Sequence, residues 1–304
     1  MSSHKTKIEQ EIVRSFLENY FKSLIKDLEY IEGGEGSQAF SFSINGKEYI
    51  IRANTRDDNF KHDNYAYTYF NSSRLPIPEI IEIGKIDDTY FYAISGKVKG
   101  KKIDDFSEEE KESIRPKLLE VLDIIHATDI SSTSNYGGWD DLGNGHHESW
   151  SSFLKSLRKW VEPKNAPSLF ETTILEKEVW KNVYNEILKL IEYCPEDRYL
   201  IHGDYGFDNV FSDGENITGV IDWGEAKYGD FIYDWAWLSY WSTNHYYRDL
   251  LKNYSVEKQI PAPNFDERMK CYELYIGLST LSFYANSQQD AKYHWNKERL
   301  LSIP

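Results

Sequence analysis

Asp204, Asn209 and Asp222 are the residues of this sequence whose types and spacing are best suited to chemistry. Asp204 and Asn209 lie in the stretch 202–209 (HGDYGFDN), five positions apart with a glycine between them, which predicts a loop. Asp222 follows the apolar, β-branched run 217–221, which predicts a short buried strand. One carboxylate can orient and deprotonate a hydroxyl, while an amide oxygen and a second carboxylate are hard ligands for Mg²⁺. Phosphoryl transfer from a nucleotide requires this set of groups.

Each of these residues alone also has an ordinary explanation. Asp and Asn in loops commonly cap helices or stabilise turns, and an isolated HGD tripeptide is frequent. The whole pattern is more specific: HGD, four residues, Asn, a strand, and then Ile221-Asp222-Trp223.

This pattern resembles the aminoglycoside phosphotransferase family, a branch of the protein-kinase-like fold in which HGDxxxxN and IDW or IDF replace the kinase catalytic loop and metal-binding Asp. The resemblance implies an α+β, bilobal fold with a small N-terminal β-sheet lobe and a mostly helical C-terminal lobe. It also implies that Asp204 is catalytic, that Asn209 and Asp222 hold Mg²⁺, and that ATP or GTP is the phosphoryl donor.

Composition is that of an ordinary soluble globular protein and not of a disordered one. The chain has 304 residues, of which 40% are hydrophobic and 28% charged, and this length allows two cores. The formal net charge of −15 disfavours nucleic acid and anionic membranes as partners. It would attract a polycation such as an aminoglycoside, although many proteins are acidic for solubility alone.

The sequence also suggests a compartment. It has two cysteines, a polar N-terminus without a signal-peptide pattern, and no apolar run near the roughly 20 residues that span a bilayer. We therefore expect a reduced, cytoplasmic protein, and a monomer.

The first 95 residues predict a nucleotide-binding lobe. An apolar stripe from Ile8 to Ile25 indicates a helix, and alternating residues in 39–44, the Asn45-Gly46 turn and 47–53 indicate a hairpin. A glycine-rich turn precedes this hairpin. Its Gly34, Gly36 and Ser37 are candidates for binding phosphates through backbone N–H groups and a hydroxyl.

Arg52 occupies the position at which kinases carry a phosphate-binding Lys. Asp63, in a helix expected over 60–72, is its candidate partner; a surface strand charge is the alternative explanation for Arg52. The stretches 40–42, 51–54 and 75–84 make the chain similar to the hygromycin B phosphotransferase branch, where Arg at position 52 is also expected.

Residues 90–94 predict the last strand of this lobe, and the segment after it predicts a hinge. Ser95 and Val98 are the candidate contacts to the nucleotide base. We expect a nucleotide-binding lobe at 1–95, a hinge at 96–100 and a catalytic and substrate-binding lobe at 101–304.

The second lobe is predicted to be mainly helical. Ser107 and Glu110 form a capping-box pattern, and Pro116 predicts a kink or a break in the helix behind them. Residues 131–149 are expected to be a loop, and further helices are expected over 153–160, 176–192, 234–254 and 265–285.

The expected reaction is transfer of the γ-phosphoryl group of ATP or GTP to a hydroxyl of an aminoglycoside, which the resemblance implies to be hygromycin B. Asp208, Glu225 and Trp241 are the candidate substrate contacts, since carboxylates and aromatic faces suit an amino sugar. Asp230 is expected to cap a helix. Two alternatives remain: a kinase of another metabolite, such as a choline-like amine, homoserine, a sugar or a macrolide, and a nucleotide-binding pseudokinase.

Overall fold

The computed structural model describes residues 6–34, 36–242 and 246–304, and it mixes helices and strands as expected for an α+β protein. The chain forms two compact units, one made of residues up to 124 together with 207–225, the other of 125–206 together with 226–304. Among the described helices, none has the length and apolarity needed to cross a membrane.

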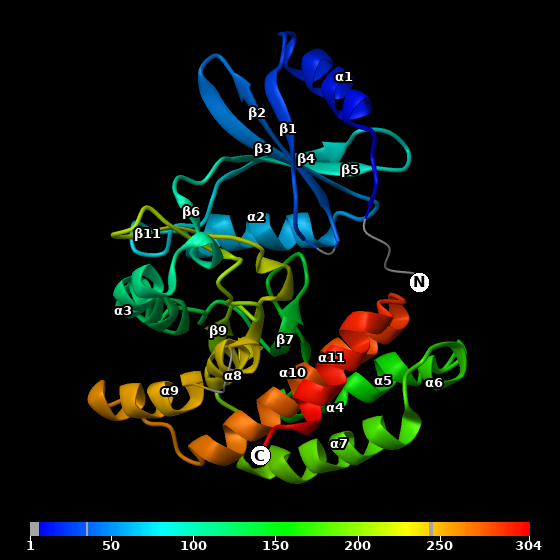
Figure 1. Cartoon of the computed structure of the whole chain (residues 1–304), viewed down its shortest axis with the longest axis vertical. Helices are drawn as coiled ribbons and strands as arrows, with labels where there is room; N and C mark the ends of the chain where they lie inside the picture. Colours follow the sequence, from blue (N-terminus) through cyan, green and yellow to red (C-terminus); the bar gives the residue numbers. More distant parts are fainter. Residues whose placement is uncertain (1–5, 35, 243–245) are drawn as a thin grey trace. The chain divides into compact units, whose positions relative to one another are not determined.

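Figure 1 labels most of the helices and strands, which are numbered in chain order. The strands are β1 (Lys26–Ile31), β2 (Gln38–Ile44), β3 (Lys47–Asn54), β4 (Ile80–Lys85), β5 (Phe91–Gly96), β6 (Lys101–Lys102), β7 (Tyr136–Trp139), β8 (Gly145–His147), β9 (Tyr199–Ile201), β10 (Val210–Ser212), β11 (Ile217–Val220) and β12 (Lys227–Gly229). The α-helices are α1 (Gln10–Phe21), α2 (Asp58–Phe70), α3 (Glu108–His126), α4 (Trp150–Lys155), α5 (Leu157–Val161), α6 (Leu169–Thr172), α7 (Lys177–Leu190), α8 (Ile232–Trp241), α9 (Tyr246–Glu257), α10 (Phe265–Asn286) and α11 (Asp290–Leu301).

The first unit is built on an antiparallel sheet of order β1-β2-β3-β5-β4. The predicted hairpin between β2 and β3 is confirmed. Asn45 and Gly46 both have positive φ, 50° and 76°, as a two-residue hairpin turn requires. Phe40, Phe42 and Ile44 alternate into the core because side chains along a strand point to opposite faces.

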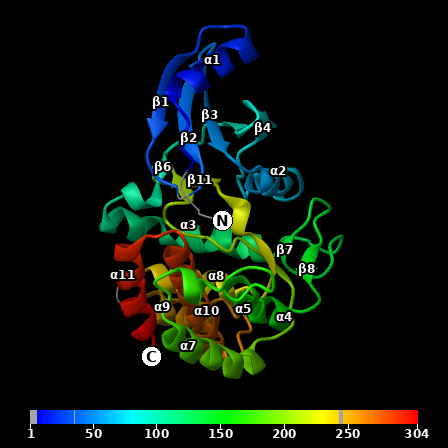
Figure 2. The same ribbon diagram turned by 90° about the vertical axis from the view of Figure 1, so that its right-hand side faces the viewer.

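α1 supplies the apolar cover of this core, and Figure 2 shows it alongside β1–β3. Its buried residues, Val13 and Leu17, pack with the sheet residues. The helix ends at Phe21 because Lys22 adopts a left-handed conformation, and Leu24 beyond it is 78% exposed. The prediction that the apolar helix face continues through Leu24 to Ile25 is therefore wrong.

α3 begins at the predicted capping box. The Ser107 N–H donates to Glu110 Oε2 at 2.7 Å, and the Glu110 N–H donates to Ser107 Oγ at 3.3 Å. Pro116 lies inside an unbroken helix, so of the two alternatives for this residue the break is wrong.

The second unit differs from prediction in two places. Residues 131–149 contain β7 and β8, part of a sheet of order β8-β7-β12-β9, so the expected loop is wrong there. The glycines that suggested a loop serve close packing instead: a Cβ on Gly145 would lie 2.5 Å from Tyr136 N. The single helix expected over 234–254 is divided into α8 and α9, because Ser242 at the end of α8 has an extended conformation; residues 243–245 lie outside the described part.

α10 is the central helix of the second unit and packs against α7, α8 and α11. Asp230 joins it to the start of α8. This fully buried carboxylate accepts hydrogen bonds from the Ile232 N–H, from Arg268 Nε at 2.8 Å and from the Tyr272 hydroxyl at 2.5 Å. Its predicted role as a structural capping residue is confirmed.

Candidate active site

The β10–β11 hairpin brings Asn209 and Asp222 to the same end. Val210 pairs with Val220, and one step further the Ile221 N–H donates to the Asn209 carbonyl oxygen at 2.9 Å. Asn209 and Asp222 therefore flank the end of the hairpin where the two strands part. Thirteen positions apart in the sequence, they are neighbours because antiparallel pairing returns the chain to its starting point.

Asp222 sits in an unusual environment. It has a φ of 63°, a left-handed conformation that turns the chain from β11 into the short helix Trp223–Glu225. Burial, followed by the negative charge of Asp63, raises the pKa of Asp222 to about 6, while Arg52 acts in the opposite direction. The carboxylate thus lies in a region where negative charge is only partly compensated.

Asp63 connects Arg52 to the turn after Asp222. One carboxylate oxygen accepts the Trp223 N–H at 2.7 Å, and the other forms a short ion pair with Arg52 Nη2. The predicted pairing of Arg52 with Asp63 is confirmed, and the alternative of a surface strand charge is wrong. The charges of Asp63 and Asp222 outweigh the effect of burial on Arg52 and leave its pKa raised.

In the second unit, Asp204 follows β9 on a loop whose backbone is held by Asp234. The His202 and Gly203 N–H groups lie 3.0 and 2.8 Å from the Asp234 carboxylate oxygens. His126 Nε2 lies 3.0 Å from the same carboxylate, which is fully buried. The Asp204 side chain, in contrast, is half-buried. The backbone that precedes Asp204 is therefore fixed by the buried Asp234 carboxylate.

Sequence reasoning missed Asp234 and His126. A signal was present, since Asp234 is the one acidic residue in the aromatic segment Phe231–Trp241. A carboxylate in such a segment is buried and must find hydrogen-bond donors. His126, at the end of α3, offered no comparable signal.

The predicted phosphate-binding turn lies between β1 and β2. Gly34 has a φ of 66°, which accounts for a glycine there, and Ser37 Oγ is 3.4 Å from Asn54 Nδ2. The Gly36 carbonyl accepts the Thr6 N–H, so the turn is tied to the N-terminal segment. Glu35 lies outside the described residues.

The two predicted base contacts differ in position. Ser95 is buried within β5 and pairs with Ile50 on one side and Ile80 on the other. Val98 follows the strand and packs against Gly219 of β11. The chain therefore leaves the sheet after Gly96.

The three predicted substrate contacts are not brought together within one unit. Asp208 and Glu225 are exposed and belong to the first unit, where the charge of Asp208 contributes to a raised pKa of Asp104 behind the larger effect of burial. Trp241 belongs to the second unit. It stacks on Trp295 with ring centroids 5.9 Å apart and an interplanar angle of 15°.

The donor chemistry around Asp222 fits a magnesium ion bound jointly with a nucleotide. Asn209 and Asp222 supply hard oxygen ligands, and Mg²⁺ commonly takes one or two protein ligands plus phosphate oxygens and water. Within the residues that the structure describes, no cluster of three or more His, Cys, Asp or Glu side chains could hold a metal ion.

Comparison with known proteins identifies the family. The profile of the phosphotransferase enzyme family matches residues 27–265, more than half of the chain. The chain belongs to this family. The phosphotransferase is also 34% identical over 273 residues to hygromycin-B 4-O-kinase of Escherichia coli, a match that covers 88% of this chain and 77% of that relative.

Solved structures extend the similarity to the fold. Aminoglycoside phosphotransferase APH(4)-Ia matches with a TM-score of 0.86 and 30% identity over 97% of this chain and 98% of that one. A thermostable mutant of the same enzyme, in ternary complex with AMP-PNP and hygromycin B, matches with a TM-score of 0.84 and 30% identity over 96% and 97%. The resemblance to aminoglycoside phosphotransferases and the kinase-like α+β fold are thus confirmed.

Proposed function

We propose that this phosphotransferase transfers the γ-phosphoryl group of ATP or GTP to a hydroxyl of an aminoglycoside, hygromycin B, and thereby confers resistance to it. The observation that carries the proposal is the connection Arg52–Asp63–Trp223. In this connection the Asp63 carboxylate binds both Arg52, the proposed phosphate-binding cation, and the turn that follows Asp222. The chain that contains it is 34% identical to a hygromycin-B kinase.

Each residue has a role in this reaction. Asp204 orients the acceptor hydroxyl and takes its proton, and Arg52 binds the phosphates with its planar fork. Asn209 and Asp222 hold Mg²⁺, which when bound neutralises phosphate charge. Gly34, Gly36 and Ser37 contribute donors to the phosphates, and Ser95 and Val98 border the base in a hinge at 96–100. These roles follow the order of parts in other phosphoryl-transfer enzymes.

The acceptor is proposed to be a polycation. The net charge of −15 favours its capture, and the exposed Asp208 and Glu225 together with Trp241 are candidate contacts. We further propose that the protein acts as a cytoplasmic monomer with its two cysteines, Cys194 and Cys271, unpaired.

A panel of acceptors tests the function. Purified protein with Mg²⁺ and either ATP or GTP is assayed for nucleoside diphosphate release with hygromycin B, other aminoglycosides, choline, homoserine, a sugar or a macrolide. We expect release only with hygromycin B, and a product heavier by one phosphoryl group in mass spectrometry. Turnover with a neutral metabolite instead would overturn the acceptor assignment, and nucleotide binding without turnover of any acceptor would favour a pseudokinase.

The dependence of the kinetics on ionic strength tests whether the acceptor is a polycation. For a polycationic acceptor captured by a negative field, kcat/KM should fall as ionic strength rises, whereas the constants for nucleotide at fixed free Mg²⁺ should change little. A flat salt profile for hygromycin B would count against electrostatic capture.

A further inference from the structure

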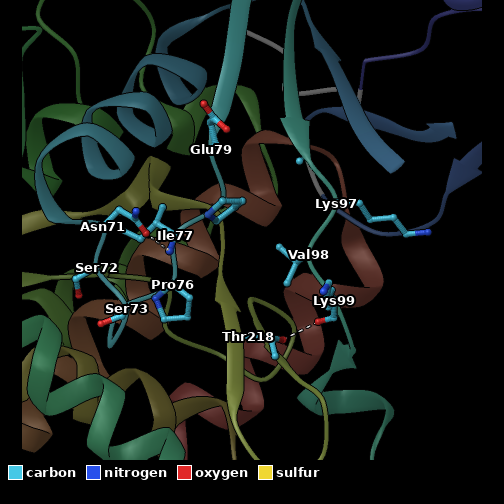
Figure 3. Close-up of a pocket in the computed structure, with 12 residues that line it drawn as sticks. Asn71, Ser72, Ser73, Pro76, Ile77, Glu79, Lys97, Val98, Lys99 and Thr218 are labelled. Atoms are coloured by element: carbon cyan, nitrogen blue, oxygen red, sulfur yellow. Dashed lines mark hydrogen bonds between the residues drawn. The ribbon is translucent and has the colours of Figure 1, made fainter. Parts of the chain in front are cut away.

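The segment that follows β5 is attached to β11, the strand that leads to Asp222. The two border a pocket of about 470 Å³, lined by residues 71–73, 76–79, 96–99 and Thr218 (Figure 3). The pocket shares Val98, and none of the phosphate or metal candidates, with the predicted site. Its walls show how the hinge segment is held.

Val98 and Gly219 form the closest part of this attachment. A Cβ built on Gly219 would lie 2.9 Å from Val98 Cγ2 and closer still to Cγ1. Real Cβ atoms do not approach a neighbour this closely, so the Val98 side chain fills the space that any larger residue at position 219 would need. Gly219 has no positive φ to explain its identity, and close packing is therefore the reason for a glycine here.

Two hydrogen bonds flank this contact. Thr218 Oγ1 donates to the Lys99 carbonyl oxygen at 2.6 Å, drawn as a dashed line in Figure 3. The Val220 N–H donates to the Pro76 carbonyl oxygen at 2.8 Å. Three successive residues of β11 thus hold the two chain segments that border the pocket.

The same strand continues directly into the metal-binding end of the hairpin. After Val220, Ile221 bonds to Asn209, and Asp222 follows. Any displacement of Val98 relative to β11 would therefore change the position of the hinge relative to both proposed magnesium ligands. A nucleotide that contacts the hinge with its base and the metal with its phosphates is sensitive to that distance.

We propose that Val98 and Gly219 are a positioning pair, which sets the spacing between the base-binding hinge and the Mg²⁺–phosphate site. This inference rests on the proposed function, because it assumes a nucleotide that uses both ends. The pair acts through packing: the Val98 side chain occupies the space that is left free because Gly219 has no side chain. The pocket beside Val98 gives it room to move, so a larger residue at 219 displaces the hinge rather than unfolding the unit.

The test is a double-mutant cycle of Gly219→Ala, Val98→Ala and the two combined. Binding of Mg²⁺ with a non-hydrolysable ATP analogue is measured by calorimetry without acceptor, and thermal unfolding is measured in parallel. Gly219→Ala should weaken binding roughly tenfold, because overpacking displaces the hinge. Val98→Ala should weaken it less, and the double variant should recover most of the affinity lost in Gly219→Ala, since the smaller side chain leaves room for the new methyl group.

Gly138→Ala is the matched control. This glycine also lies in a strand, without a positive φ, but its Cβ would stand an ordinary 3.8 Å from its nearest neighbour. It should leave nucleotide affinity unchanged. If Gly219→Ala fails to fold, Thr218→Val and Thr218→Ser replace it: loss of the bond to Lys99 should weaken binding severalfold, and Ser should restore it.

The outcomes separate the two proposals. A wild-type protein that does not bind the analogue overturns the proposed function. A wild-type protein that binds it, together with losses that simply add in the double variant or with a Gly219→Ala variant of unchanged affinity, overturns the positioning pair alone. Affinity recovered in the double variant, with the control unaffected, supports it.

Discussion

Each unit contains one candidate site aspartate, and a second, buried carboxylate fixes the backbone next to it. In the first unit Asp63 accepts the N–H of Trp223, the residue after Asp222. In the second unit Asp234 accepts the N–H groups of His202 and Gly203, the residues before Asp204. In both units, the candidate side chain is half-buried while the backbone beside it is held by hydrogen bonds.

The two buried carboxylates, Asp63 and Asp234, differ in their partners. Asp63 pairs with Arg52, a permanent cation whose side chain is 21% exposed and which could also bind phosphate. Asp234 is paired with His126, whose side chain is only 9% exposed. Under the proposed function, Asp63 is therefore bonded to a residue that binds the nucleotide phosphates, whereas the partners of Asp234 have no proposed role in binding a ligand. Substitutions should reveal this difference, because Asp234 variants should change kcat whereas Arg52 variants should change the nucleotide KM.

Asp204→Ala should give the largest loss. If this carboxylate accepts the hydroxyl proton, kcat should fall by roughly 10²–10⁴-fold, while affinity for the nucleotide measured by calorimetry stays nearly constant. A variant that keeps more than a tenth of the wild-type turnover would sink the assignment of Asp204 as the base.

Asp234→Asn should give the second-largest loss of kcat. The amide cannot accept all the donors that the carboxylate accepts, so the loop before Asp204 should shift, and a misplacement of about 1 Å can cost about 10²-fold in kcat. Each buried donor left unsatisfied also costs about 1–3 kcal/mol of stability. Turnover at saturating substrates and thermal melting measure the two effects.

Asp230→Asn is the control for that variant. Asp230 is also a fully buried carboxylate of the second unit, but its partners are Arg268, Tyr272 and the start of α8. It should lower stability by a comparable amount with much less effect on kcat of the protein that remains folded. Equal kcat losses in both variants would show that Asp234 acts only through stability.

Arg52 variants should change a different constant. Arg52→Ala should raise the nucleotide KM by roughly 10–100-fold, the range expected for loss of a charge-assisted hydrogen bond, and leave the acceptor KM nearly constant. Arg52→Lys should recover part of the loss, because a point charge replaces a planar fork. A change confined to melting temperature would assign Arg52 a structural role only, and would remove the difference between Asp63 and Asp234 drawn above.

The same comparison shows what could be predicted from sequence. The resemblance to the kinase pattern assigned roles to Arg52, Asp63, Asn209 and Asp222, because each lies in or beside a strand or helix that the sequence predicts. The Arg52–Asp63 pair was found as expected. The local pattern around Asp234 indicates a buried carboxylate, but its partners, the N–H groups of His202 and Gly203, lie about 30 positions away and follow only from the tertiary fold.

Errors in the fold have similar causes. The glycines of 136–145 suggest a loop, yet they allow β7 and β8 to pack closely. The apolar stripe of the first helix continues past Phe21 in sequence, but a left-handed Lys22 ends the helix. In both cases tertiary packing or a single backbone torsion overrides local preference.

Asp222→Asn tests the smallest effect, and it asks which carboxylate is the principal partner of Arg52. An unfolded Asp loses its proton near pH ~4, whereas burial and Asp63 raise the folded pKa of Asp222 to about 6. Between these values the folded state binds more protons than the unfolded state, so stability falls as pH rises. The full energetic cost of the buried Asp222 charge is present above the folded pKa.

Asparagine at position 222 removes this charge at nearly constant shape. In metal-free protein, Asp222→Asn should therefore melt higher than wild type at pH 8, and the difference should vanish toward pH 4. Adding Mg²⁺ and nucleotide should stabilise wild type and leave the variant almost unchanged, reversing the order. A metal-free variant that melts lower at pH 8 would mean that attraction between Asp222 and Arg52 exceeds the cost of burial, so that Asp63 alone does not satisfy the arginine.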